Sequence, residues 1–250
     1  MSWEHIVLVL VAGIICGIIN TLAGSGSLIS LPILMFIGLP PHVANGTNRI
    51  GIFFQNIVST LNFKKQKVLD VKMGWKVAIP SIIGSITGAL IVLELNERAV
   101  EIVVGVVLFI MLIPLFLKPH KWLHGTHPDE LSSNYILRFL IFFFIGAYGG
   151  FIQAGVGIFL LSALVLNAGY DLVKANALKV FINLIFTPFA LAVFIYKGQI
   201  DIVAGIVLAV GNSTGAYFAS KYAVSWGPLF VKYVLIVVIL GAGTKLLFFP

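Results

Sequence analysis

Apolar residues fill most of this chain in runs of about 20, separated by short polar stretches. Runs of this length are typical of membrane-spanning helices, whereas the strands of an outer-membrane barrel would alternate apolar and polar residues. The pattern therefore predicts an all-α polytopic membrane protein with a single transmembrane domain over residues 1–250. The expected helical segments are 4–22, 27–38, 43–63, 74–93 and 98–117 in the first half and 135–153, 157–168, 172–196, 201–220 and 227–248 in the second.

The two halves repeat one another in the order and spacing of small and polar residues. Ala23-Gly24-Ser25-Gly26 has a counterpart in Ala154-Gly155-Val156-Gly157, and Ala44-Asn45 has one in Ala175-Asn176, both at an offset of 131 residues. Gly84-x-x-x-Gly88 matches Gly211-x-x-x-Gly215 at an offset of 127. Ordered matches of this kind indicate an internal duplication. The predicted organisation is repeat 1 at about 1–117, a loop at 118–134 and repeat 2 at about 135–250.

The second segment of each half is short and follows a glycine-rich break. Segments 27–38 and 157–168 hold 12 residues each, whereas a straight crossing needs about 20. Broken backbone at membrane depth survives only inside protein or beside water, and paired breaks in two halves indicate the binding site of a transporter. Helix amino termini at such breaks favour an anion, and we expect the two breaks to face each other near the midplane. The backbone candidates are Gly24, Ser25, Gly26, Gly155 and Gly157.

The basic residues gather at the ends of the apolar segments, and the net charge is +7. If all ten segments cross, 12 of the 16 basic residues fall on one side; if the short segments dip in and return, the split is ten against six. The stronger split fits the positive-inside rule, not a nucleic-acid-binding surface. It predicts two inverted repeats in the cytoplasmic membrane, with both termini extracytoplasmic and no nucleic acid as a partner.

An amide and a cation lie near the start of the third segment of each half. Arg49 follows Asn45 by four residues and Lys179 follows Asn176 by three, so each pair shares a helical face. The amides either cap their helices or also donate to a ligand. Arg49 is expected to bind the cargo, because a guanidinium forms a two-point fork for an oxyanion. For Lys179, reaching toward the lipid headgroups is favoured over ligand contact. Asn20 and Gln153 adjoin the breaks and complete the candidates.

Carboxylates and histidines lie only at segment ends and in loops. Proton-coupled carriers commonly place such groups inside the membrane, so their distribution here favours a positively charged site for an anion, in a transporter or in a channel or uniporter. A membrane-embedded, lipid-modifying enzyme is less favoured, because the histidine cluster His120, His124 and His127 falls in the central loop. The sequence predicts no enzyme, no cofactor and no metal site.

One motif resembles a known family. Asn20-x-x-Ala23-Gly24-x-Gly26-x-x-x-x-x-Pro32, followed by Ala44-Asn45 and a basic residue, is similar to the bacterial sulfite exporter TauE/SafE family. Members commonly have Gly-x-Gly-Gly, whereas here Ser27 and Ile158 take the last position, and Ala163 stands where the first half has Pro32. The resemblance covers nearly the full chain. It implies transport of a small sulfur-containing anion, sulfite or an organosulfonate, across the bilayer, and it specifies neither direction, coupling ion nor oligomeric state.

Overall fold

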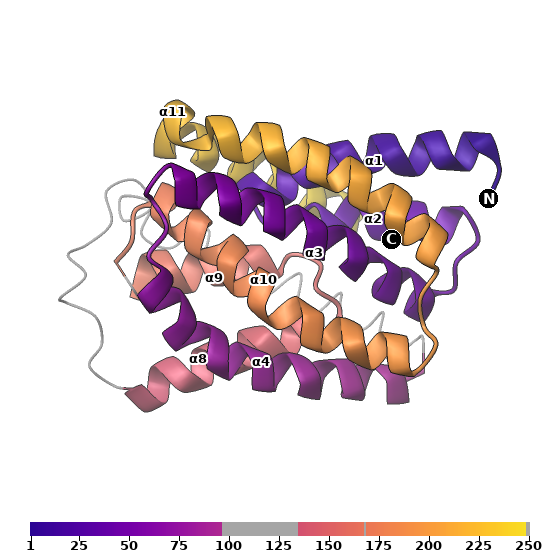
Figure 1. The fold of residues 1–250 in the computed structure, drawn as a ribbon, viewed down its shortest axis with the longest axis horizontal. Coiled ribbons are helices and arrows are strands. Elements are labelled where there is room, and N and C mark those ends of the chain that lie inside the picture. The colour runs from indigo at the N-terminus through magenta and orange to yellow at the C-terminus, as the bar shows by residue number, and fades with distance from the viewer. Residues whose placement is uncertain (97–134, 168, 249–250) are drawn as a thin grey trace.

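The computed structural model describes residues 1–96, 135–167 and 169–248, which form a bundle of helices (Figure 1). No strand occurs among these residues, so the all-α prediction is confirmed. The elements are α1 (Trp3–Leu22), α2 (Ser27–Phe36), α3 (Pro41–Lys65), α4 (Val71–Glu94), α8 (Tyr135–Phe151), α9 (Val156–Ser162), the π-helical η2 (Ala163–Asn167), α10 (Leu172–Tyr196) and α11 (Ile202–Phe248).

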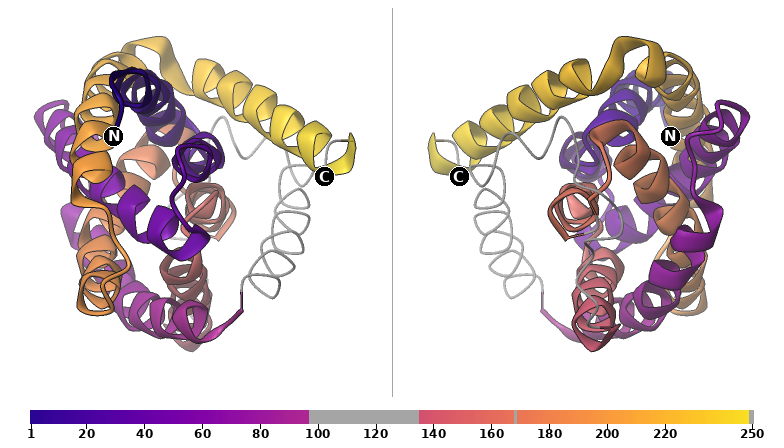
Figure 2. Two further views of the ribbon diagram at one scale, coloured as in Figure 1. Left: turned by 90° about the vertical axis from the view of Figure 1, so that its right-hand side faces the viewer. Right: turned by 90° about the vertical axis from the view of Figure 1, so that its left-hand side faces the viewer.

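The expected segments correspond to these helices, with one clear exception. Segments 201–220 and 227–248 are a single continuous helix, α11, so the predicted boundary between them is wrong. Figure 2 shows α11 turning away from the bundle toward its yellow, carboxyl-terminal part. Gly227 and Pro228 lie at the expected boundary, and a proline, which has no N–H, bends a helix without ending it. Segment 98–117 and the loop 118–134 with its histidines lie outside the described residues.

Acidic caps open three of the helices. The carboxylate of Asp70 accepts a hydrogen bond from Met73 N at 3.0 Å at the start of α4, and that of Asp201 accepts one from Ala204 N at 2.9 Å at the start of α11. Asp171 does the same for α10 through Val173 N, at 3.0 Å. These oxygens satisfy amides that have no partner within the helix. Asp70 and Asp201 are also 131 residues apart, which adds a pair to the repeat.

Helix α3 differs from its neighbours in being polar along its buried face. Four described stretches are long and apolar enough to cross a membrane: Trp3–Leu22, Val71–Glu94, Leu172–Tyr196 and Ile202–Trp226. Helix α3 has 25 residues but is not one of them, and its polar side chains are buried by the surrounding helices. A polar helix is tolerated at membrane depth when protein covers it. The buried polar residues of α3 are Asn45, Thr47, Asn48, Arg49, Gln55, Asn56, Ser59 and Thr60.

The glycine motifs of α4 and α11 mark the closest helix contacts. A Cβ atom on Gly84 would lie 2.0 Å from the carbonyl oxygen of Phe143 in α8, and one on Gly88 would lie 1.8 Å from that of Ala147. A Cβ atom on Gly215 of α11 would lie 2.0 Å from the carbonyl oxygen of Ile14 in α1. Only a residue without a side chain allows backbones to approach this closely. The close packing expected for both motifs is therefore present.

The helices form two groups that meet where α3 packs on α10. In one group α11 packs on α1 and α3; in the other α4 packs on α8 and α10. Helix α4 runs parallel to α8, and α11 runs parallel to α1. In the α4–α8 pair the contacts move from Gly84–Phe143 to Gly88–Ala147, so residue numbers rise together along both helices. Helices α3 and α10 are antiparallel, since Arg49 near the start of α3 lies over Phe194 near the end of α10.

Corresponding helices of the two halves make corresponding contacts. If α1, α2, α3 and α4 match α8, α9, α10 and the start of α11, then the α1–α11 contact matches α8–α4, and α3–α11 matches α10–α4. Each group thus contains two long helices from one half and one from the other. The exchange of α4 and α11 joins the halves through extensive helix packing, so they cannot separate as independent domains.

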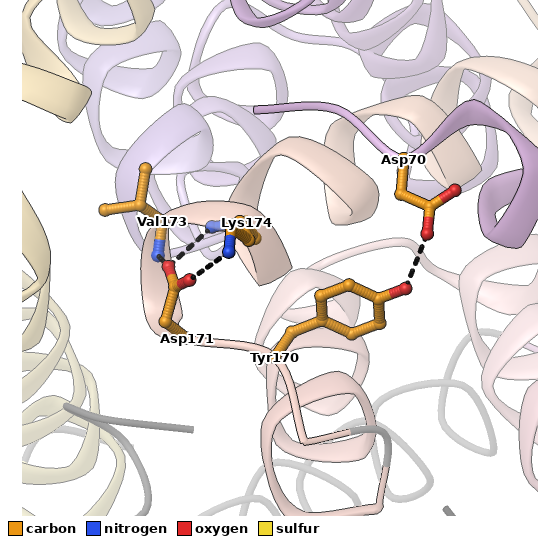
Figure 3. Close-up of polar contacts among 5 residues, drawn as sticks. All are labelled: Asp70, Tyr170, Asp171, Val173 and Lys174. Carbon is orange, nitrogen blue, oxygen red and sulfur yellow. Dashed lines mark hydrogen bonds and ion pairs between the residues drawn. The ribbon is translucent and has the colours of Figure 1, made fainter. Parts of the chain in front are cut away.

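Polar contacts connect the loops at one end of the bundle (Figure 3). The hydroxyl of Tyr170, in the segment before α10, donates to the carboxylate of Asp70, before α4, at 2.8 Å. Burial and this hydrogen bond raise the pKa of Tyr170, so its hydroxyl stays protonated at neutral pH. Asp171 forms an ion pair with Lys174 at 3.4 Å on the same rim.

Candidate functional site

The two helix breaks lie against each other. The backbone N–H of Gly157, in the first turn of α9, donates to the carbonyl oxygen of Gly24 at 3.1 Å. A Cβ atom on either glycine would lie 2.3 Å from the Cα of the other, so the contact requires glycine on both sides. Gly24 also has a φ of +81°, in the left-handed region that glycine adopts without strain. The breaks that follow α1 and α8 therefore meet through their backbones.

Asn20 shapes the first break. Its Oδ1 accepts a hydrogen bond from Gly26 N at 2.7 Å, immediately before α2, and its Nδ2 donates to Gln55 Oε1 at 3.4 Å. The last turn of α1 is thereby joined to the start of α2 and to α3. Ser25, between them, is buried, and its hydroxyl has no hydrogen-bonding partner among the described residues. Asn20 is thus occupied by protein groups, while the Ser25 hydroxyl is left without one in the described part of the chain.

The second break contains a strained residue. Gln153 has a φ of +59°, in the left-handed region, which costs a residue other than glycine about 1–2 kcal/mol. Its side chain is fixed, because Nε2 donates to Thr187 Oγ1 at 3.0 Å and Oε1 accepts from Arg49. The neighbouring carbonyl of Ala154 accepts a hydrogen bond from the Tyr148 hydroxyl at 2.6 Å. Several contacts therefore hold this strained turn.

Arg49 is fully buried and binds the carboxyl-terminal end of α8. Nη1 donates to the carbonyl oxygen of Gly149 at 2.9 Å and to Gln153 Oε1 at 3.1 Å. Nη2 donates to the carbonyl of Gly150 and to Asn45 Oδ1 at 3.3 Å. The guanidinium also lies over the ring of Phe194, with its central carbon 4.6 Å from the ring centroid. Of its five N–H groups only Nε–H has no partner among the described residues.

Lys179 is also fully buried and binds the corresponding end of α1. Its Nζ donates to the carbonyl oxygens of Asn20 and Thr21 at 2.8 and 2.9 Å. The expected reach toward lipid headgroups is therefore wrong, and the lysine ends in the interior. An ammonium group has three donors, and no third acceptor is present among the described residues. Each half thus supplies a cation to the terminal carbonyls of the other half's first helix, where the helix dipole is negative.

Asn45 and Asn176 occupy matching positions but have different surroundings. Neither caps its helix, since α3 starts at Pro41 and α10 is capped by Asp171, so the capping interpretation is wrong. Asn45 Nδ2 donates to the carbonyl of Phe151 at 2.8 Å. Asn176 is fully buried, and both its amide atoms lack a partner in the part of the chain that the structure describes. An unsatisfied buried polar group costs about 1–3 kcal/mol, so this amide requires a partner.

Both buried cations lack a carboxylate partner among the described residues. The buried polar residues there include amides, hydroxyls, Arg49 and Lys179, but no aspartate or glutamate. Lys179 and Asn176 lie on one face of α10, a single turn apart, beside the end of α1. Burying a charge without a counter-charge costs several kcal/mol. The arrangement offers positive charge and hydrogen-bond donors to a desolvated anion.

Several residues that form this region were not candidates from the sequence. Thr187 and Tyr148 fix the second break, Phe194 covers Arg49, and Asn48 joins α3 to α2 by donating to Ser27 Oγ at 3.1 Å. Asn48 and Thr187 are polar residues inside an expected span, which is a signal that could have identified them. Nothing in the local pattern separates Tyr148 or Phe194 from the many aromatic residues on the exposed surface of the bundle.

The comparison with known families agrees with the sequence motif. A family model described as Sulfite exporter TauE/SafE matches residues 9–246. The chain belongs to this family. TauE/SafE proteins form a membrane transporter family, and the long apolar helices fit that class.

Curated relatives match this chain over most of their lengths. A probable membrane transporter protein, ORF9, from Sinorhizobium sp is 26% identical, with 100% of this chain and 95% of that protein covered. A probable membrane transporter protein from Haemophilus influenzae is 25% identical, with 94% and 92% covered. The probable membrane transporter protein YunE from Bacillus subtilis is 26% identical, with 86% of each chain covered. No solved structure matches this chain.

Proposed function

We propose that this protein carries a small sulfur-containing oxyanion, sulfite or an organosulfonate, across the cytoplasmic membrane. The proposal rests on one observation above all: Lys179 is fully buried with an unused N–H, one helical turn from the unpartnered amide of Asn176. A buried cation beside a free amide, with no carboxylate in reach among the described residues, is suited to an anion with several acceptor oxygens. The family supplies the chemical class of the cargo.

The cargo site lies at the first break. Lys179 approaches the carbonyls of Asn20 and Thr21, and Ser25 with its unpartnered hydroxyl follows four residues after Thr21. Sulfite and sulfonates present three oxygens on one sulfur, so the ammonium, the amide and the hydroxyl can each donate to one of them. Gly24 and Gly157 bring the backbones of the two breaks together, Gly26 packs against the Cys16 carbonyl, and Asn20 holds the start of α2 in position.

The two halves act as inverted repeats in this proposal. Support comes from the directions of matching helices: α1, α3 and α11 run one way, α4, α8 and α10 run the other, and every matching pair is opposed. Alternating access in such folds is largely a movement of one bundle against the other around a central site. The α3–α10 interface, where the two groups meet, is the natural surface for that movement.

Flux into proteoliposomes tests the proposal. Labelled sulfite, sulfate, thiosulfate and taurine would be offered separately to vesicles that contain the parent protein or Lys179→Met. We expect saturable flux of sulfite or taurine by the parent and none above empty vesicles by the variant. Flux that does not saturate would instead identify an anion channel. Absence of flux for all four compounds, with correctly inserted protein, would refute the proposed cargo class.

A further inference from the structure

We propose that Arg49 is a positioning residue: it holds the carboxyl-terminal end of α8 and the strained turn at Gln153, and it leaves cargo binding to Lys179. This inference rests on the transport function proposed above and divides the roles of the two buried cations. It also differs from the expectation, drawn from the sequence, that Arg49 is the main anion ligand.

The hydrogen bonds of Arg49 support this role. All four N–H groups on Nη1 and Nη2 are matched by protein acceptors: the carbonyls of Gly149 and Gly150 and the side chains of Gln153 and Asn45. The planar fork that would bind an oxyanion is the part already in use. Phe194 lies over the face of the guanidinium, so that face is not accessible to a cargo oxygen. Only Nε–H remains, which offers one donor instead of two.

The contacts of Arg49 hold a strained turn in the second break. Gln153 and Gly155 both have positive φ, whereas the first break has positive φ only at Gly24. A glutamine in the left-handed region persists only where its surroundings hold it there, and residues of this kind concentrate at functional and moving sites. Arg49 is the group that contacts Gln153 and also the preceding carbonyls of α8. Loss of Arg49 would therefore loosen the break, with only Thr187 and Tyr148 left to hold it among the side-chain contacts described above.

Release of the break would affect the other half directly. Gly157, two residues beyond Gly155, donates to the Gly24 carbonyl and so contacts the break beside the proposed cargo site. Lys179 makes fewer contacts at the matching place: two carbonyls and no side chain. Among the described residues Lys179, with one of its three donors free, thus lies beside the unpartnered Asn176, whereas Arg49, with only Nε–H of its five donors free, lies beside the strained turn. This asymmetry is what assigns ligand and positioning roles to different residues.

Hydrogen exchange and transport kinetics of Arg49→Lys together test the proposal, with Lys174→Arg as the control on the exposed rim. The ammonium of the lysine introduced at position 49 keeps the positive charge but cannot bind all four acceptors of Arg49. We expect faster amide exchange confined to residues 150–158, a maximum rate of sulfite flux reduced about tenfold, and a KM within about twofold of the parent, because a loss confined to rate leaves ground-state binding intact. Lys174→Arg should match the parent in all three.

Two other outcomes would overturn the proposal. A KM raised about tenfold or more with unchanged exchange at 150–158 would make Arg49 a cargo ligand, since an interaction lost from binding appears in KM. Faster exchange throughout the bundle with normal flux per folded molecule would make it a general stabilising residue. Exchange is measured without cargo, so it tests the role of Arg49 even if sulfite proves not to be transported.

A second pair of variants tests the strain itself. Gln153→Gly and Gln153→Ala both remove the acceptor for Arg49, but only glycine adopts positive φ without strain. We expect Gln153→Gly to melt at a higher temperature than Gln153→Ala, with faster exchange at 150–158 in both. Equal melting temperatures would show that the left-handed turn carries no strain, which would remove the reason for a positioning role.

Discussion

Asn45 and Asn176 lie at matching positions of the two repeats, yet only Asn45 has its amide bonded by protein. Its Nδ2 donates to the carbonyl of Phe151 and its Oδ1 accepts from Arg49, whereas neither amide atom of Asn176 has a partner among the described residues. The same residue type thus has two different environments at these two positions. Asn45 joins the halves, and Asn176 is the residue that we propose binds the cargo.

This difference predicts that the same substitution affects stability at Asn45 and cargo binding at Asn176. Asn45→Ala should destabilise the protein by about 1–3 kcal/mol, because it leaves a buried carbonyl and part of Arg49 unsatisfied. Asn176→Ala should leave the melting temperature near that of the parent and weaken sulfite binding. Thermal melting and calorimetric titration with sulfite, in detergent, measure the two effects. Tight sulfite binding by Asn176→Ala would exclude this amide from the site.

Replacing the lysine of the proposed site should abolish cargo binding. Lys179→Met keeps the length of the side chain but removes a buried charge, and losing one partner of such a pair costs about 2–5 kcal/mol of binding free energy. Lys174→Met is the matched control, because Lys174 is exposed and forms only a surface ion pair with Asp171. Calorimetry with sulfite should show normal affinity in the control. Normal affinity in Lys179→Met would place the site elsewhere.

The contact between Gly24 and Gly157 predicts intolerance to a single added carbon. Gly24→Ala introduces both an unfavourable φ and a Cβ only 2.3 Å from the Gly157 backbone. Gly198→Ala is the matched control, since Gly198 has a φ of +67° but nothing within 4 Å of its Cβ position. We expect the control to lose about 1 kcal/mol through strain alone, and Gly24→Ala to lose several times more or to lose flux completely. Similar melting temperatures would indicate that the two breaks separate easily.

Cysteine labelling tests the orientation in the membrane. Lys72 lies at the start of α4, whereas Lys197, just after α10, forms an ion pair with Glu94 at the end of α4, so the two lysines occupy opposite ends of the bundle. On a Cys16→Ser background, Lys72→Cys should react with a membrane-impermeant maleimide only from the cytoplasmic side. Lys197→Cys should react only from outside. The reverse pattern would overturn the prediction of extracytoplasmic termini.

The contact between Tyr170 and Asp70 predicts a stability effect that disappears at high pH. Tyr170→Phe removes the only hydrogen bond that the structure describes between these two loops and should lower the free energy of unfolding by about 1.5–3 kcal/mol, as for hydrogen bonds to charged groups. The pKa of Tyr170 is raised by burial and by Asp70, so this contribution is complete below the ordinary tyrosine value of about 10 and is lost as pH rises beyond it. Denaturant titrations of parent and variant at neutral and alkaline pH measure the difference. A constant difference across that range would contradict the assignment.

The sequence alone determined the class, the breaks and most helix positions. Runs of apolar residues long enough to span a bilayer identify a membrane protein, and glycine-rich stretches within them destabilise a continuous helix. The motif around Gly24 also led to the TauE/SafE family. These features are readable because they depend on local composition and spacing. The continuous α11 was missed for the same reason, since a local Gly-Pro pair indicates a boundary but packing decides whether the helix continues.

Only the tertiary structure decided what the two buried cations do. Residue type and spacing put Arg49 and Lys179 on comparable faces and favoured arginine as the ligand. The fold places Arg49 against the end of α8 with its fork fully used, and Lys179 against the end of α1 with one donor free. The backbone carbonyls among those acceptors come from helices about a hundred residues or more away. A sequence specifies which groups can donate, but the folded chain determines which acceptors reach them first.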